Sequence, residues 1–328
     1  MPTKPKDIKL KNVATLAKFK PNGNNFITSH MDGRVRIYEY FESRKPKRRA
    51  SIKIHPGPVR SFVLDETSQS IFSCCDEKTV RRTDLETIQV MQDYTCENDD
   101  LACLYRFSEK ILVSTSNDGQ LTIFDTLSSK IIKKIDIGET FTCMIGSDGW
   151  KTLMYCSSEG FLHAYSLKNW RLLDKSDLQE DEYTCGAIIS ANKVLFGSSQ
   201  KGRFCVYNRN EWGNPSDILY TSTSSIDHVE PIDESTLVFT ALDGFVGSYH
   251  TYPSYLAGYY CKRVPSIITS CSVSTEADLL MISHEDGLSF WSLEQDLLSN
   301  TSLKKSSKRQ NSNNMINRIQ SGNFFSDL

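Results

Sequence analysis

The sequence contains the segment Leu112-Val113-Ser114-Thr115-Ser116-Asn117-Asp118-Gly119-Gln120-Leu121-Thr122-Ile123-Phe124-Asp125, in which two runs of strand-forming residues flank an Asp-Gly pair. Glycine has no Cβ, so this pair can adopt the positive φ angles that a tight hairpin turn requires. After the turn the side chains alternate, with Leu121 and Ile123 on one face and Thr122 and Phe124 on the other. The segment therefore predicts a β-hairpin whose second strand has two different faces.

The same pattern occurs seven times in the chain. Each copy begins with apolar residues followed by small polar ones and has a turn at a glycine or its substitute. After the turn, apolar and polar residues alternate up to the last residue of the copy, which is usually aromatic. The turn positions are 41 to 45 residues apart, and they are Gly33, Lys78, Gly119, Gly160, Gly202, Gly244 and Gly287. A regular period of this size predicts a repeat architecture.

Each repeat has room for four short strands, because further strand-forming residues precede the first two copies at 13–19 and 59–64. Four strands per unit, with an aromatic residue and often an acidic one at the end of the third, resemble the blade of a WD-repeat propeller. The resemblance covers residues 8–293 and rests on Tyr38-Glu39, Phe124-Asp125, Trp291-Ser292 and His55-Pro56-Gly57. It implies an all-β fold, a seven-bladed WD40-type β-propeller. The second copy departs furthest from the pattern, with Lys78 at the glycine position and Thr83 at the aromatic one.

The two ends of the chain indicate how the ring closes. Residues 8–10 precede the first full repeat, whereas the chain after Trp291 turns polar and offers no further outer strand. We therefore expect the N-terminal strand to complete the last blade, leaving no sheet edge open there; a disordered N-terminal arm is the alternative. One propeller over residues 1–296 and a flexible tail over residues 297–328 then account for the chain.

Composition narrows the class of protein. Hydrophobic residues make up 39% of the chain, which is enough for seven packed sheets. No apolar run approaches the roughly 18 residues of a membrane span, and the start has no apolar signal core, so we expect neither a membrane partner nor secretion. The ten cysteines form no Cys-x-x-Cys pair, which favours small buried side chains over a metal site. We expect no metal and no cofactor.

Charge is distributed unevenly along the chain. Residues 1–60 contain 15 Lys and Arg against 4 Asp and Glu, out of totals of 38 and 40. The sequence thus predicts one basic sector on an otherwise acidic ring, and such asymmetry favours a partner of nucleic-acid or acidic character.

The densest basic stretch is residues 43–49, which we expect to form a solvated loop before a strand at 50–54. Three interpretations are open for this loop: a nuclear-import signal, a contact with nucleic-acid phosphates, and an ordinary solubilising loop. The candidate residues are Arg44, Lys45, Lys47, Arg48 and Arg49.

The C-terminal tail is rich in Ser, Asn and Lys and cannot bury a core, so the sequence predicts disorder there. Its last residues include an apolar cluster that either anchors the tail in a partner's groove or packs on the propeller itself. The residues concerned are Phe324, Phe325, Asp327 and Leu328.

No arrangement of residues indicates catalysis, which requires a nucleophile or base beside its partner. None of the six histidines lies in a catalytic or metal-binding pattern. We expect His55 to brace its blade by a hydrogen bond, and we expect the protein not to be an enzyme.

Residues 160–291 resemble one branch of the WD-repeat class, the WD repeat-containing protein 55 family. The resemblance rests on Gly197-Ser198-Ser199, Trp212-Gly213, Ile226-Asp227 and the run from Val238 to Val246. It implies a non-enzymatic nucleolar scaffold in ribosome biogenesis, with ribosome-assembly proteins and pre-ribosomal RNA as partners and no small-molecule substrate. The rival interpretation is a substrate-recruiting adaptor of a cullin-type ubiquitin ligase, but the arginine that such adaptors carry after the Trp-Asp pair is absent from all seven copies.

Overall fold

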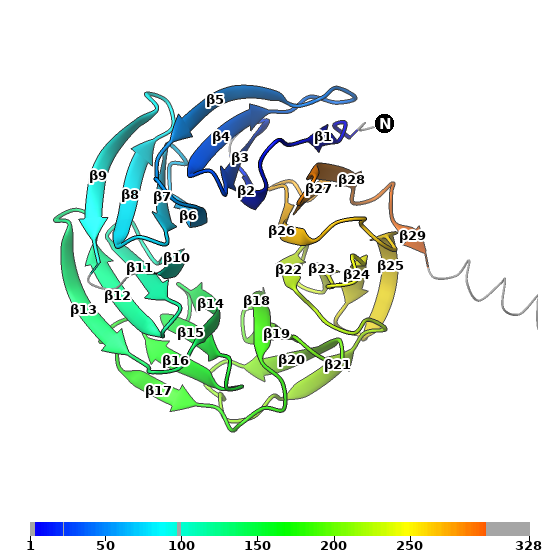
Figure 1. Ribbon diagram of the computed structural model, residues 1–328. Helices are drawn as coiled ribbons and strands as arrows, with labels where there is room; N and C mark the ends of the chain where they lie inside the picture. The colour runs from blue at the N-terminus through cyan, green and yellow to red at the C-terminus, as the bar shows by residue number, and fades with distance from the viewer. Residues whose placement is uncertain (1–3, 22, 97–99, 300–328) are drawn as a thin grey trace, which may run out of the picture.

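The computed structural model describes residues 4–21, 23–96 and 100–299, and in them the chain forms seven antiparallel sheets arranged as a ring (Figure 1). In blades 1 to 5 the strands follow one another in sequence from the centre outward, as expected for a hairpin-connected blade, whereas the outermost strand is β29 in blade 6 and β1 in blade 7. The predicted fold, an all-β seven-bladed propeller, is confirmed.

The strand bounds follow the repeat. Blade 1 contains β2 (Ala14–Phe19), β3 (Asn25–His30), β4 (Arg34–Glu39) and β5 (Lys47–Lys53). Blade 2 contains β6 (Val59–Leu64), β7 (Ser70–Cys75), β8 (Thr79–Asp84) and β9 (Gln89–Thr95). Blade 3 contains β10 (Leu101–Arg106), β11 (Ile111–Ser116), β12 (Gln120–Asp125) and β13 (Lys130–Asp136). Blade 4 contains β14 (Phe141–Ser147), β15 (Thr152–Ser157), β16 (Leu162–Ser166) and β17 (Leu172–Lys175). Blade 5 contains β18 (Tyr183–Ser190), β19 (Lys193–Ser198), β20 (Arg203–Asn208) and β21 (Asp217–Tyr220). Blade 6 contains β22 (His228–Pro231), β23 (Thr236–Thr240), β24 (Val246–His250), β25 (Tyr255–Cys261) and β29 (Leu298–Ser299), and blade 7 contains β26 (Ile268–Val273), β27 (Leu279–His284), β28 (Gly287–Ser292) and β1 (Ile8–Lys9).

The turn glycine of blades 1 and 3 to 6 packs against the loop that leads to the next blade, whereas that of blade 7 packs against β1. In blade 1, Gly33 has a φ of 76°, and an added Cβ would lie 2.0 Å from the carbonyl oxygen of His55. Glycine is required here both for its backbone conformation and for this close approach. The repeated glycine therefore marks the point where hairpin and inter-blade loop meet.

The aromatic residue that ends the third strand packs between blades. Phe124 is buried and lies opposite Leu112 on the neighbouring strand. In the second copy, Thr83 takes the aromatic position and lies opposite Ile71, which packs in the cluster between blades 1 and 2. On the other face of blade 2, Tyr94 of the outer strand β9 packs between blades 2 and 3, with its ring centroid 6.0 Å from that of Phe72 and 5.8 Å from that of Phe124. The second repeat thus lacks the aromatic residue on the side of blade 1 but has an aromatic core on the side of blade 3.

The N-terminal strand closes the ring, as predicted. β1 pairs with β28 in blade 7, with Ile8 opposite Leu288, and the amide of Phe290 donates to a carboxylate oxygen of Asp7 at 3.0 Å. The blade-closing contact thus joins the two ends of the propeller (Figure 1).

The other end differs from the sequence prediction. Disorder was expected from residue 297, but Leu298 and Ser299 form β29, a fifth strand on the edge of blade 6. Gly258 makes room for it, since a Cβ there would lie 2.8 Å from the carbonyl oxygen of Leu298. Leu297 also packs against the apolar cluster between blades 6 and 7. The segment is polar overall, so its composition did not indicate that Leu297 and Leu298 attach it to the propeller.

Candidate interaction surfaces

The predicted basic loop is partly a strand. Arg44 and Lys45 lie in the connection after β4, but Lys47, Arg48 and Arg49 begin β5, which starts three residues earlier than expected. The prediction of a fully solvated loop was therefore wrong for these three residues. Backbone pairing with β4 tolerates the neighbouring charges, because all five side chains remain exposed and Arg49 forms an ion pair with Glu39.

The N-terminal segment lies beside this basic stretch. The amide of Lys6 donates to the carbonyl oxygen of Arg44 at 3.0 Å, and the amide of Ser43 donates to that of Lys4 at 3.2 Å. Lys4 is paired with Asp296, with 2.8 Å between Nζ and Oδ2. We use the name basic rim for the cations here that form no ion pair within the described part of the chain: Lys6, Arg44, Lys45, Lys47 and Arg48.

The candidate residues of the tail cannot be placed. Phe324, Phe325, Asp327 and Leu328 lie outside the described residues. The last described residues, in β29, end on the outer edge of blade 6.

The histidines serve the packing of blades. His55 is buried, and its Nε2 lies 3.0 Å from Oγ of Ser73 in the next blade, which confirms the bracing role expected for it. Burial lowers the pKa of His55 to about 4, and Arg81 contributes to the shift. His163 lies 3.0 Å from Glu139, a loop residue that also binds Lys175. Within the described residues no group of three or more His, Cys, Asp or Glu could hold a metal ion, and no helix is long and apolar enough to cross a membrane.

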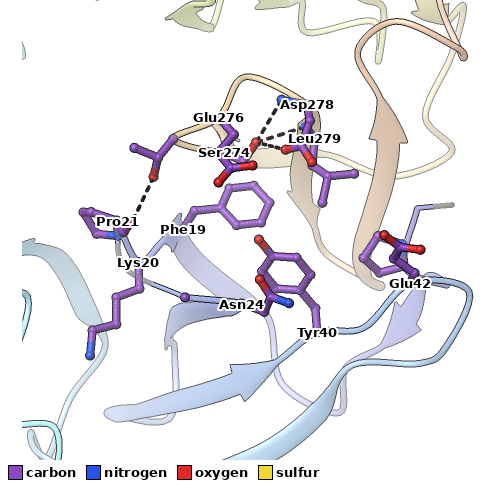
Figure 2. Close-up of a pocket in the computed structure, with 13 residues that line it drawn as sticks. Phe19, Lys20, Pro21, Asn24, Tyr40, Glu42, Ser274, Glu276, Asp278 and Leu279 are labelled. Atoms are coloured by element: carbon purple, nitrogen blue, oxygen red, sulfur yellow. Dashed lines mark hydrogen bonds between the residues drawn. The ribbon is translucent and has the colours of Figure 1, made fainter. Parts of the chain in front are cut away.

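A cavity that the sequence did not reveal lies where the ring closes. It has a volume of about 250 Å³ and is lined by the ends of β2, β4 and β26 and by the loops that follow them. Figure 2 shows the rings of Phe19 and Tyr40 facing the turn that contains Ser274, Glu276 and Asp278. These two sets of residues are about 250 positions apart in the chain. Only the closure of the ring brings them together, so no local motif could have indicated the site.

Comparison with known proteins agrees with this geometry. The family model described as "WD domain, G-beta repeat" matches residues 9–39, which run from β1 to the end of β4. The chain is a WD40-repeat β-propeller. Propellers of this family are typically non-catalytic scaffolds for protein interactions.

Over most of its length this propeller is distantly homologous to proteins named WD repeat-containing protein 55 homolog. The one from Drosophila willistoni is 27% identical over 88% of this chain and 58% of its own length. The one from Drosophila virilis is 24% identical over the same shares, and the one from Drosophila ananassae is 23% identical over 99% of this chain and 69% of its own length. The chain thus spans little more than half of the first relatives that it matches.

Proposed function

We propose that this propeller is a non-enzymatic scaffold in ribosome biogenesis that acts in the nucleus and nucleolus. It holds ribosome-assembly proteins on its ring and contacts pre-ribosomal RNA through the basic rim. The distant homology over most of the chain supports the scaffold role, and the resemblance to the WD repeat-containing protein 55 family suggests the pathway.

The observation that carries the proposal is the basic rim. Its five cations are exposed and lie on the outer edge of blade 1 and the adjoining N-terminal segment. Two of them, Lys47 and Arg48, are held by strand β5, so their backbones need no ordering on binding. Free cations on a fixed backbone suit phosphate contacts, which bind RNA without reading its sequence and weaken as salt is added.

A matched pair of variants tests the RNA contact. Lys47 lies opposite Glu39 in blade 1, and Lys130 lies opposite Asp125 at the same place in blade 3. The variant Lys47→Glu with Arg48→Glu should bind an RNA hairpin more weakly than the wild-type protein does. Its slope of log affinity against log salt should fall by about 1.5–2, since roughly one counterion is released per phosphate contact. Lys130→Glu with Lys133→Glu should leave both quantities unchanged.

The cellular role is tested separately. The tagged protein should accumulate in nucleoli and co-sediment with pre-ribosomal particles, and reversing the charges of Arg44, Lys45, Lys47, Arg48 and Arg49 should reduce one or both. A protein that stays in the cytoplasm and never sediments with such particles would overturn the proposal. Recovery of cullin subunits in place of assembly factors would favour the ubiquitin-ligase interpretation.

A further inference from the structure

The cavity where blades 7 and 1 meet, which we name the seam cavity, has firmly held walls. The amide of Phe19 donates to Oγ of Ser272 at 3.3 Å, and the amide of Tyr40 donates to the carbonyl oxygen of Asn24 at 2.9 Å. Oγ1 of Thr275 donates to the carbonyl oxygen of Pro21 at 3.4 Å, which ties the turn of blade 7 to that of blade 1 (Figure 2). Hydrogen bonds within blade 1 and between the two blades therefore define the shape of the cavity.

One wall of the seam cavity is aromatic. The rings of Phe19 and Tyr40 are 5.6 Å apart at an angle of 73°, an edge-to-face pair. Leu279 continues this wall on the side of blade 7. An aromatic surface of this kind accepts an apolar side chain or the flat face of a cation.

The other wall is acidic. Glu276 and Asp278 belong to the turn between β26 and β27, where Oγ of Ser274 donates to Asp278 at 2.5 Å. Glu42 stands at the side of the cavity. Burial raises the pKa of the Tyr40 hydroxyl above its usual value, and the carboxylates of Asp278 and Glu276 raise it further, so their negative field reaches the aromatic wall.

Within the described residues, Glu276 and Asp278 have no cationic partner from the protein. Among the described residues that line the cavity Lys20 is the one cation, and Figure 2 shows its Nζ pointing away from the rings of Phe19 and Tyr40. A ligand that brings a positive charge and a flat apolar face would satisfy both walls together.

We propose that the seam cavity receives an arginine side chain from a basic segment of a partner protein. A guanidinium group is planar, stacks on aromatic rings and pairs with carboxylates through two parallel hydrogen bonds, whereas an ammonium group is a compact, strongly hydrated charge. The proposal rests on the scaffold role, because it names the chemistry of one partner. A partner protein with a basic segment would then bind at the seam cavity, and RNA would bind at the basic rim.

The test uses the purified full-length protein and two capped pentapeptides, Gly-Ser-Arg-Ser-Gly and the same peptide with citrulline in place of arginine. Citrulline keeps the shape of arginine but carries no charge. Ligand-observed NMR suits the dissociation constant expected for a single side chain, on the order of 1 mM. The arginine peptide should bind at least about fivefold more tightly than the citrulline peptide, since charge-assisted hydrogen bonds are roughly twice as strong as neutral ones.

Substitutions in the cavity locate the binding. Glu276→Gln with Asp278→Asn keeps the side-chain shapes and should weaken the arginine peptide about tenfold by removing both charges. Tyr40→Leu should weaken it by a smaller factor. Glu234→Gln is the matched control, because Glu234 is an exposed carboxylate in the corresponding turn of blade 6 and should leave binding unchanged.

Equal binding of the two peptides, or an unchanged affinity in the Glu276→Gln, Asp278→Asn variant, would overturn the proposal. So would tighter peptide binding after Arg309→Ala with Arg318→Ala, since the chain's own tail would then be the occupant. None of these results depends on pre-ribosomal particles. The seam cavity and the proposed cellular role can therefore fail independently.

Discussion

Two contacts between blades differ in what holds them. Blades 4 and 5 follow each other in the chain, and large apolar side chains fill their contact: the rings of Trp150 and Trp212 are 6.1 Å apart, and both side chains are buried. Blades 7 and 1 also share an apolar cluster, in which the ring centroids of Phe26 and Phe290 are 5.7 Å apart. Hydroxyl groups bonded to backbone add to this contact, as where the amide of Ala17 donates to Oγ of Ser270 at 2.9 Å. We call this second contact the closing seam.

The difference follows from the topology of the ring. At the closing seam the bonded residues are 253 positions apart, so the short connection that aligns blades 4 and 5 is missing, and closing so long a loop costs conformational entropy. Apolar packing has no direction and tolerates sliding along a strand, whereas a hydrogen bond to a given amide fixes the register. The hydroxyl-to-backbone bonds therefore fix the register at the closing seam, as the bond from the amide of Leu104 to Oγ of Ser61 does between blades 2 and 3. The seam cavity opens beside these bonds.

The largest effect is expected at the apolar contact. Trp212→Ala should lower the free energy of unfolding by about 3–5 kcal/mol, because the cavity it leaves would lie within a well-packed cluster. Urea denaturation of the two proteins measures the difference. Tyr220→Ala on the adjacent strand β21 is the control, since that ring is 64% exposed. A loss at Trp212 no larger than at Tyr220 would contradict the assignment of this contact to apolar packing.

Within blade 7, where β1 closes the ring, the most damaging single methyl group is expected at Gly287. A Cβ there would lie 2.0 Å from the carbonyl oxygen of Ile8, and its next neighbours are also backbone atoms of β1. Gly287→Ala should displace β1 and cost about 3 kcal/mol, the upper part of the range for overpacking. Hydrogen exchange of Ile8 and Phe290 and the melting temperature report the displacement. Gly213→Ala, whose Cβ would meet nothing within 4 Å, should change neither.

These contacts show what the sequence could and could not predict. Each hairpin could be read from its own residues, since the turn glycine and the alternation are local, and ring closure followed from an unused strand at residues 8–10. The start of β5 at Lys47 was missed, because charge repulsion was weighed without the backbone pairing that offsets it. The strand at Leu298 and the seam cavity were missed because each depends on residues far along the chain that only the folded ring brings close.

Acid should weaken the contact between blades 1 and 2, where His55 lies beside Ser73. His55 has a pKa of about 4 in the folded protein against 6.5 as its ordinary value, so the unfolded chain takes up a proton first as the pH falls. Stability is then fully present above pH 6.5 and is lost down to pH 4, by about 2 kcal/mol at pH 5 for this one group. His55→Gln should shrink the difference in unfolding free energy between pH 7 and pH 5 by that amount. His250→Gln, at the surface, should not; an unchanged difference in the His55 variant would show that another group causes the acid sensitivity.

The smallest effect is expected at the ion pair between Lys4 and Asp296. Lys4 and Asp296 are 2.8 Å apart, but their side chains are 41% and 30% exposed, so solvent screens the pair. Lys4→Ala should cost less than about 1 kcal/mol at low salt, and the loss should disappear in 1 M NaCl, where the screening length is about 3 Å. Because Asp296 also accepts a hydrogen bond from the amide of Ser292, a double-mutant cycle with Asp296→Ala is needed to separate the ion pair from that turn. A coupling energy between Lys4 and Asp296 that does not change with salt and exceeds the coupling energy between Trp212 and Trp150 would contradict this prediction. The ion pair would then stabilise the propeller more than the apolar contact does.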